Sequence, residues 1–274
     1  MTEIINQWPI IAALIATGIF AGILAGLFGV GGGIVIVPVL YFLLQGFGVS
    51  PESAMMIATA TSLATIVPTS ISSIRSHHAK GNIDLALIKY WAPFILVMAV
   101  ICSYLAHSIR GNALVLMFAC IAILVSLNML FRAGAPALVS KLPGKFGQGI
   151  MASIVGGLSV MIGIGGGTIG VPMLNAFKVR AHVAVGTAAV FGLLIALPGV
   201  ITLLSIGTTP TDAPLGTWGL VNLPAFILII PLTILFAPIG VKIGSKLDQK
   251  QLKRAFAVVL MITGIRMLIQ TLGA

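Results

Sequence analysis

The chain has 274 residues, of which 59% are hydrophobic and 7% are charged, and its formal net charge is +10. Soluble domains carry about 25% charged residues, so this composition excludes a soluble globular protein. The basic residues stand in short loops between apolar segments, which argues against a surface that binds nucleic acid. The composition therefore predicts a polytopic helical protein embedded in the lipid bilayer.

Successive apolar segments predict the helices. A helix needs about 20 apolar residues to cross a hydrocarbon core about 30 Å thick. Two segments, 33–47 and 167–177, are too short to span comfortably, and each follows a triple glycine directly. In chain order the expected segments are 9–28, 33–47, 53–74, 85–107, 112–131, 147–163, 167–177, 181–206, 218–241 and 254–273.

The basic residues predict the orientation. Of the 15 lysine and arginine residues, all except Arg110 and Arg266 fall in or beside four connections between segments. These four connections lie on one side of the membrane if each short segment forms a hairpin with the segment before it. By the positive-inside rule that side is cytoplasmic, and both termini lie outside. The residues concerned are Arg75, Lys80, Lys89, Arg132, Lys141, Lys145, Lys178, Arg180, Lys242, Lys246, Lys250, Lys253 and Arg254.

The chain contains an internal repeat. "FGVGGGIVIVPVL" begins at Phe28 and "IGIGGGTIGVPML" begins at Ile162; "ATATS" (58–62) matches "AVGTA" (184–188), and "GNID" (81–84) matches "GLVN" (219–222). An odd number of crossings in each copy inverts the second copy, as is typical of secondary transporters. The prediction is an all-α membrane protein with 8–10 membrane helices, two of them broken or re-entrant. Its repeats are residues 1–132 and 147–274, joined by a cytoplasmic linker, 133–146.

The triple glycines break their helices and leave backbone N–H and C=O groups unpaired, which a membrane interior tolerates only inside protein or beside a wet cavity. One interpretation is close helix packing by small residues. The other is anion binding by helix N-termini, which the duplication and the half-length segments favour. Nearby hydroxyls either support that site or bond to their own helix. The predicted substrate-binding residues are Gly31, Gly32, Gly33, Thr59, Thr61, Ser62, Gly165, Gly166, Gly167, Thr168 and Thr187.

None of the five carboxylates falls in the middle of a predicted segment, which argues against a cation carrier. No metal site, cofactor or catalytic motif is expected, so an enzyme is disfavoured. His77, His78 and His182 stand at cytoplasmic segment ends, as interfacial residues or as a gate or proton-handling group. Arg266 either reaches toward the outer interface or adds positive charge to an anion path.

The paired glycine phrases, each followed by the "ATATS"-like stretch, resemble the TauE/SafE sulfite exporter family, as does "HHAKGNID" at 77–84. The resemblance covers nearly the whole chain. It implies transport of sulfur-containing anions such as sulfite or sulfonates across a bacterial inner membrane. Ala188 replaces the serine of the second copy, so that hydroxyl is not carried over.

These observations predict a secondary transporter that moves a small sulfur-containing oxyanion by alternating access. An anion channel, or a carrier of another small organic anion, is the alternative. The small residues are also compatible with a homodimer. Substrate, direction and coupling are left open by the sequence.

Overall fold

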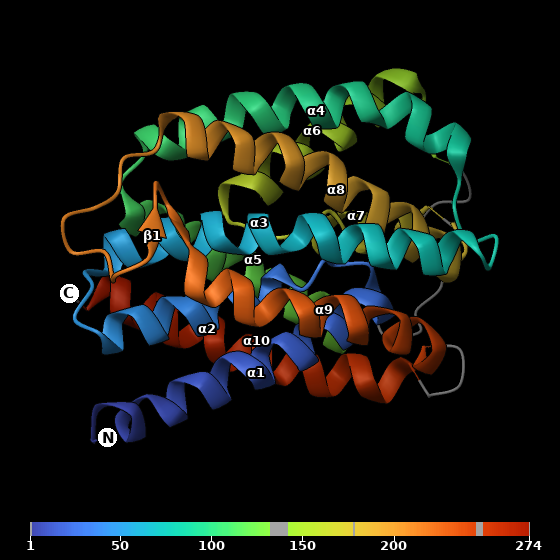
Figure 1. The fold of residues 1–274 in the computed structure, drawn as a ribbon. Helices are drawn as coiled ribbons and strands as arrows, with labels where there is room; N and C mark the ends of the chain where they lie inside the picture. Colours follow the sequence, from blue (N-terminus) through green and yellow to red (C-terminus); the bar gives the residue numbers. More distant parts are fainter. Residues whose placement is uncertain (1, 132–141, 178, 245–248, 274) are drawn as a thin grey trace.

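The computed structural model describes residues 2–131, 142–177, 179–244 and 249–273. This part of the chain is almost entirely helical (Figure 1). The helices are α1 (Thr2–Phe28), α2 (Gly33–Gly46), α3 (Pro51–His78), α4 (Leu85–Ser108), α5 (Gly111–Phe131), α6 (Lys145–Met161), α7 (Gly167–Ala176), α8 (Ala181–Ile206), α9 (Leu223–Ile243) and α10 (Gln249–Leu272). Two short antiparallel strands, β1 (Thr217–Trp218) and β2 (Val221–Asn222), precede α9.

Six described helices, α1, α3, α4, α5, α8 and α9, are long and apolar enough to cross a membrane. The all-α polytopic membrane fold is therefore confirmed. By contrast, α2 has 14 residues and α7 has 10. At 1.5 Å per residue they reach about 21 Å and 15 Å, less than the hydrocarbon thickness.

The chain turns back at each triple glycine. In Figure 1, α2 returns toward the end where α1 begins, and α7 returns toward the end where α6 begins. Both termini lie at one end of the bundle, and the α3–α4 and α7–α8 connections lie at the other. This arrangement agrees with the predicted orientation, in which the basic connections share a side. Of the basic positions used for it, Arg132, Lys141, Lys178 and Lys246 lie outside the described residues, as does 133–141 of the predicted linker.

Several predicted boundaries were wrong. The helix expected from residue 218 begins at Leu223. Val221 and Asn222 form strand β2, which pairs with β1, and the Asn222 side chain caps the start of α9. The segment expected to end at residue 74 continues to His78, so the Arg75 and His77 backbones are helical.

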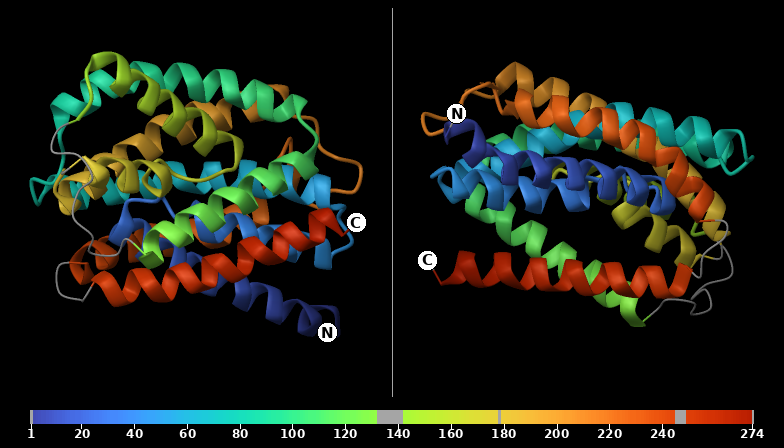
Figure 2. Two further views of the ribbon diagram at one scale, coloured as in Figure 1. Left: turned by 180° about the vertical axis from the view of Figure 1, so that it is seen from behind. Right: turned by 60° about the horizontal axis from the view of Figure 1, so that its bottom comes forward.

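Contacts between helices occur in reciprocal pairs, as a two-fold relation between the copies requires. Helix α1 packs on α9 as α6 packs on α4, and α3 packs on α9 as α8 packs on α4. Helices α5 and α10, which correspond, pack on each other at one side of the bundle (Figure 2). The boundaries of the repeats stay a prediction.

The same reciprocity extends to single hydrogen bonds. Thr61 Oγ1 accepts the backbone N–H of Asn222 at 2.9 Å, and Thr187 Oγ1 accepts the backbone N–H of Asp84 at 3.0 Å. Asp84 and Asn222 in turn cap α4 and α9, each accepting a backbone N–H three residues later at 3.0 Å. The two threonines thus secure the starts of α4 and α9.

Thr61→Val and Thr187→Val should both destabilise the protein. Each variant leaves a buried or part-buried backbone amide without its acceptor, which costs on the order of 1–3 kcal/mol. The measurement is the melting temperature of the detergent-solubilised protein. Thr263→Val is the matched control, because that exposed hydroxyl bonds only to Val259 of its own helix. Equal melting temperatures for all three variants would contradict the assignment.

Candidate functional site

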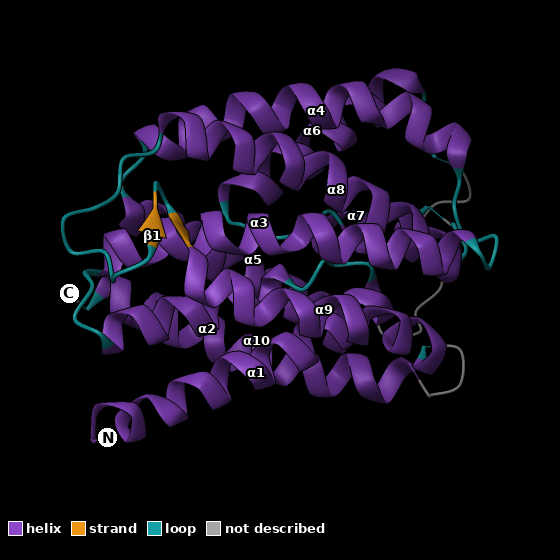
Figure 3. Ribbon diagram, in the orientation of Figure 1, coloured by secondary structure: helices purple, strands orange, loops and turns teal. Residues whose placement is uncertain are grey.

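The two glycine breaks meet in direct backbone contact inside the bundle (Figure 3). We call Gly29–Gly33 and Gly163–Gly167 together the glycine crossing. A Cβ added at Gly31 would lie 3.5 Å from Cα of Gly165, and one added at Gly165 would clash with the carbonyl of Val30. The two helix breaks, one in each copy, are therefore adjacent in the fold.

The contacts of the crossing are exchanged between the copies. A Cβ at Gly33 would strike the carbonyl of Gly163, and a Cβ at Gly167 would strike that of Gly29. In the same way, Gly29 packs on Val185 and Gly163 packs on Thr59, which occupy matched positions in α8 and α3. The crossing is therefore built from two equivalent halves.

Glycine is needed at the crossing for two reasons. In the first copy, Gly29, Gly31 and Gly32 have φ of 65°, 69° and 80°, a left-handed region that side chains disfavour. Gly166 has φ of −58°, which any residue adopts, but a Cβ there would lie 2.5 Å from Cβ of Phe191. Left-handed φ values are more numerous in the first copy, although Gly163 of the second also has φ of 71°, and close approach constrains both copies.

The crossing presents the N-termini of α2 and α7, whose N-cap residues Gly32 and Gly166 make no side-chain capping bond. Such ends carry free N–H groups and partial positive charge. Thr168, in the first turn of α7, is buried, and its hydroxyl has no hydrogen-bond partner among the described residues. These groups match the chemistry of an oxyanion site.

The predicted hydroxyl residues divide into two sets. Ser62 Oγ donates to the carbonyl of Gly163 at 2.7 Å, and the backbone and methyl group of Thr59 pack on Gly163, while its hydroxyl has no partner among the described residues. Both residues contact the crossing. The Thr61 and Thr187 hydroxyls instead accept the backbone N–H groups of Asn222 and Asp84, the N-cap residues of α9 and α4. Neither hydroxyl bonds to the crossing.

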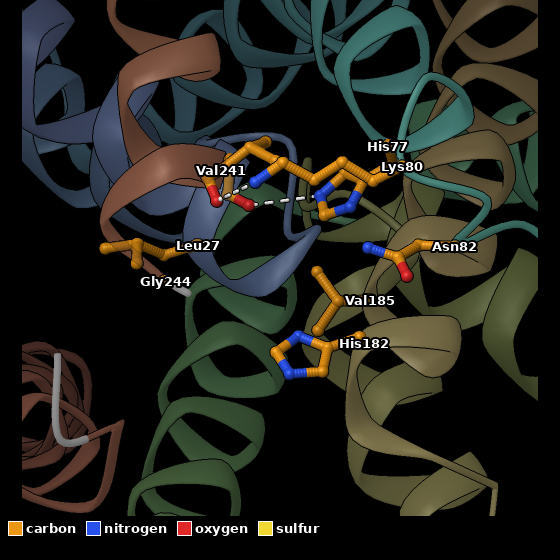
Figure 4. A pocket seen from close by; sticks show the side chains of 9 residues that line it. Leu27, His77, Lys80, Asn82, His182, Val185, Val241 and Gly244 are labelled. Atoms are coloured by element: carbon orange, nitrogen blue, oxygen red, sulfur yellow. Dashed lines mark hydrogen bonds between the residues drawn. The ribbon is translucent and has the colours of Figure 1, made fainter. Parts of the chain in front are cut away.

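A cavity of about 270 Å³ lies at the end of the bundle that carries the α3–α4 and α7–α8 connections (Figure 4). We call it the inner vestibule. Three basic side chains and one amide line it, and no carboxylate does so among the described residues. The lining residues are Gly26, Leu27, His77, Lys80, Asn82, His182, Val185, Val241 and Gly244.

The basic groups of the vestibule are held by backbone carbonyls. Lys80 Nζ donates to the carbonyl of Val241 at 2.9 Å. His77 is 4% exposed; its Nε2 lies 3.1 Å from the carbonyl of Gly26, and its Nδ1 has no partner. Since a carbonyl only accepts, Nε2 carries the proton, and Nδ1 is then a hydrogen-bond acceptor without a partner among the described residues. A cavity with one sign of charge concentrates ions of the other sign.

The vestibule includes only part of the predicted gate set. His77 and His182 line it, whereas His78 is exposed and does not. Arg266 is exposed on α10 with its guanidinium carbon 4.4 Å from the centre of the Phe42 ring, so it lines neither cavity described here. Lys80 and Asn82 were missed, because Lys80 was used only as a marker of orientation.

A second cavity, of about 10 Å³, is bordered by Thr59, His107 at the outer end of α4, and apolar side chains. At the outer end, Asp212 accepts the backbone N–H of Ser50, the N-cap of α3, at 2.8 Å. Hydrogen bonds from the Ser50 and Ser53 side chains and from the Ser50 amide lower the pKa of Asp212 to about 2. Asp212 thus ties the α8–α9 connection to the start of α3.

The family model for the sulfite exporter TauE/SafE matches residues 14–267. The chain belongs to this family. It is 32% identical over 264 residues to a probable membrane transporter protein of Haemophilus influenzae, covering 96% of this chain and 100% of the relative. A probable membrane transporter protein of Methanocaldococcus jannaschii is 29% identical, covering 93% and 94% of the two chains. The probable membrane transporter YunE of Bacillus subtilis is 25% identical, covering 93% and 96%. No solved structure matches the chain significantly.

These findings identify a membrane transporter of the TauE/SafE family, in agreement with the resemblance read from the sequence. The glycine crossing and the inner vestibule lie within the matched residues. The side chains that hold the substrate are not assigned by the comparisons.

Gly167→Ala should disrupt the protein, whereas Gly170→Ala in the same helix should not. The first Cβ would strike the Gly29 carbonyl, and forced overpacking costs roughly 1–3 kcal/mol or more. The second would meet the Phe191 ring at an ordinary 3.5 Å and improve helix propensity. Melting temperature and yield of monodisperse protein measure the difference. If both variants matched the wild type, the close contact at the crossing would be refuted.

Proposed function

We propose that this protein is a secondary transporter of a small sulfur-containing oxyanion, such as sulfite or a sulfonate, in a bacterial inner membrane. The single observation that supports it most is the position of the glycine crossing. Two free helix N-termini meet there, directly beyond a basic vestibule that no described carboxylate lines. Amides, hydroxyls and partial positive charge suit an oxyanion without any buried counter-charge.

Alternating access is the mechanism that this geometry favours. The crossing is a backbone contact between a larger cavity on the inner side and a small one toward the outer end. The reciprocal contacts of the two copies support a proposed second conformation, related to the first by exchange of the copies, in which the outer cavity opens and the inner one closes. An anion enters the vestibule, reaches the crossing, and leaves on the other side when the copies rock. A channel, the alternative, would need one continuous opening.

Purified protein in liposomes should take up radiolabelled sulfite or sulfoacetate with saturable kinetics. A carrier binds one substrate in each cycle, so unlabelled anion on the opposite side should accelerate uptake of label. Sulfate and chloride test selectivity. Absence of transport for every sulfur anion would overturn the substrate class, while non-saturable flux without this acceleration would favour the channel.

Lys80→Gln should raise KM for the anion about five- to tenfold with little change in kcat. Removing one charge from a partly solvated cavity costs on the order of 1 kcal/mol of binding, since tenfold is 1.4 kcal/mol. Glutamine can still donate to the Val241 carbonyl, and Lys80→Arg should keep the wild-type KM. Lys89→Gln is the matched control, because Lys89 is exposed on α4 and does not line the vestibule. A similar KM for Lys80→Gln and Lys89→Gln would show that Lys80 does not attract the anion.

A further inference from the structure

Helix α3 carries two rows of buried polar side chains that differ in their bonding. In one row, the hydroxyls of Thr61, Thr65 and Thr69 all have partners: Asn222, Ser62 and Thr233 respectively. In the other row, the Ser70 and Ser73 hydroxyls and His77 Nδ1 have none. Spacings of three and four residues place Ser70, Ser73 and His77 on one face of α3. Their exposed fractions are 1%, 1% and 4%.

The unpartnered row leads from the inner vestibule to the glycine crossing. At its base, His77 lines the vestibule. At its top, the Ser70 hydroxyl lies beside Gly192, where an added Cβ would be 2.9 Å from Ser70 Oγ and 3.8 Å from the amide nitrogen of Gly166. Ser70 therefore stands near the N-terminus of α7. One turn further along α3, Ile66 packs against Gly31 and Gly33 and ends the row.

An unpartnered hydroxyl in a membrane protein interior is unfavourable, because its hydration is lost and nothing replaces it. Two such hydroxyls, Ser70 and Ser73, stand on one face with the unpartnered acceptor Nδ1 of His77, so the row can bind water or a ligand during the cycle. The matched positions of α8 show that the fold does not require them. There the chain has Ala196, Gly199 and Leu203, which carry no polar side-chain atom.

We propose that Ser70, Ser73 and His77 form the inner half of the anion path, by which substrate passes from the inner vestibule to the N-terminus of α7. This inference rests on the proposed transport function and names residues that act in it. Hydroxyls donate to an oxyanion without adding a competing charge. In this structure the buried His77 ring is bonded to the Gly26 carbonyl of α1 and stands between the vestibule and the two serines. The matched residues of α8, Ala196, Gly199 and Leu203, carry no polar side-chain atom, so the polar approach to the crossing lies on the inner side.

Cysteine accessibility tests this path without requiring the substrate to be known. In a background with Cys102→Ala and Cys120→Ala, Ser70→Cys and Ser73→Cys are compared with Thr65→Cys and Thr69→Cys, which are equally buried but whose native hydroxyls have partners. A membrane-impermeant methanethiosulfonate reagent is applied to inverted membrane vesicles, which expose the cytoplasmic side. We expect the two serine positions to react at least about tenfold faster, because a thiol reacts as the thiolate where water reaches it.

Addition of sulfite or sulfoacetate should slow the reaction at Ser70→Cys and Ser73→Cys, and Ser70→Ala should raise KM for transport. Equal, slow labelling at all four positions would overturn the path, even if the protein transports sulfur anions. Fast labelling of the two serine positions, unaffected by any sulfur anion, would support the path and overturn the substrate class. Faster labelling from the opposite side, in right-side-out vesicles, would overturn the inner placement of the row.

Discussion

Glycine backbones of the two copies touch where Gly29–Gly33 meets Gly163–Gly167, and the surrounding helices enclose that contact. A broken helix inside a membrane exposes N–H and C=O groups that lipid cannot satisfy. The chain resolves this by folding each break back as a short hairpin and enclosing both in the long helices. Side chains larger than hydrogen would separate the two copies, so the crossing fixes their distance.

The charge distribution follows from the same constraint. A carrier that held its substrate with a buried lysine or arginine would have to stabilise that charge when empty. Free helix N-termini avoid this, because their partial charges belong to the backbone. A full charge is found at the mouth instead, where Lys80 reaches the vestibule and water screens it. In the function proposed above, the group that attracts the anion is thus separated in space from the groups that bind it.

The two copies share a backbone plan but differ in side chains, and this difference gives the site a direction. Ser62 bonds across the crossing to Gly163, whereas its counterpart Ala188 cannot. The unpartnered polar row of α3 has an apolar counterpart in α8. A symmetric frame permits two equivalent conformations, and the asymmetric side chains make the inner side of the crossing the more polar one.

The sequence alone determined the membrane class, the duplication and the existence of two broken helices, because hydropathy and glycine runs are local properties. It also indicated the family, since the glycine phrases recur in both halves. It could not determine which hydroxyls face the crossing. Thr59, Thr61 and Ser62 are neighbours in sequence, but successive positions on a helix point about 100° apart, and Thr61 faces Asn222 while Ser62 faces Gly163. Only the tertiary structure decided that Lys80, His77 and His182 share one cavity, because they come from different helices and connections. It also decided that Arg266 stacks on Phe42, since the partner of a side chain depends on helix packing rather than on sequence spacing.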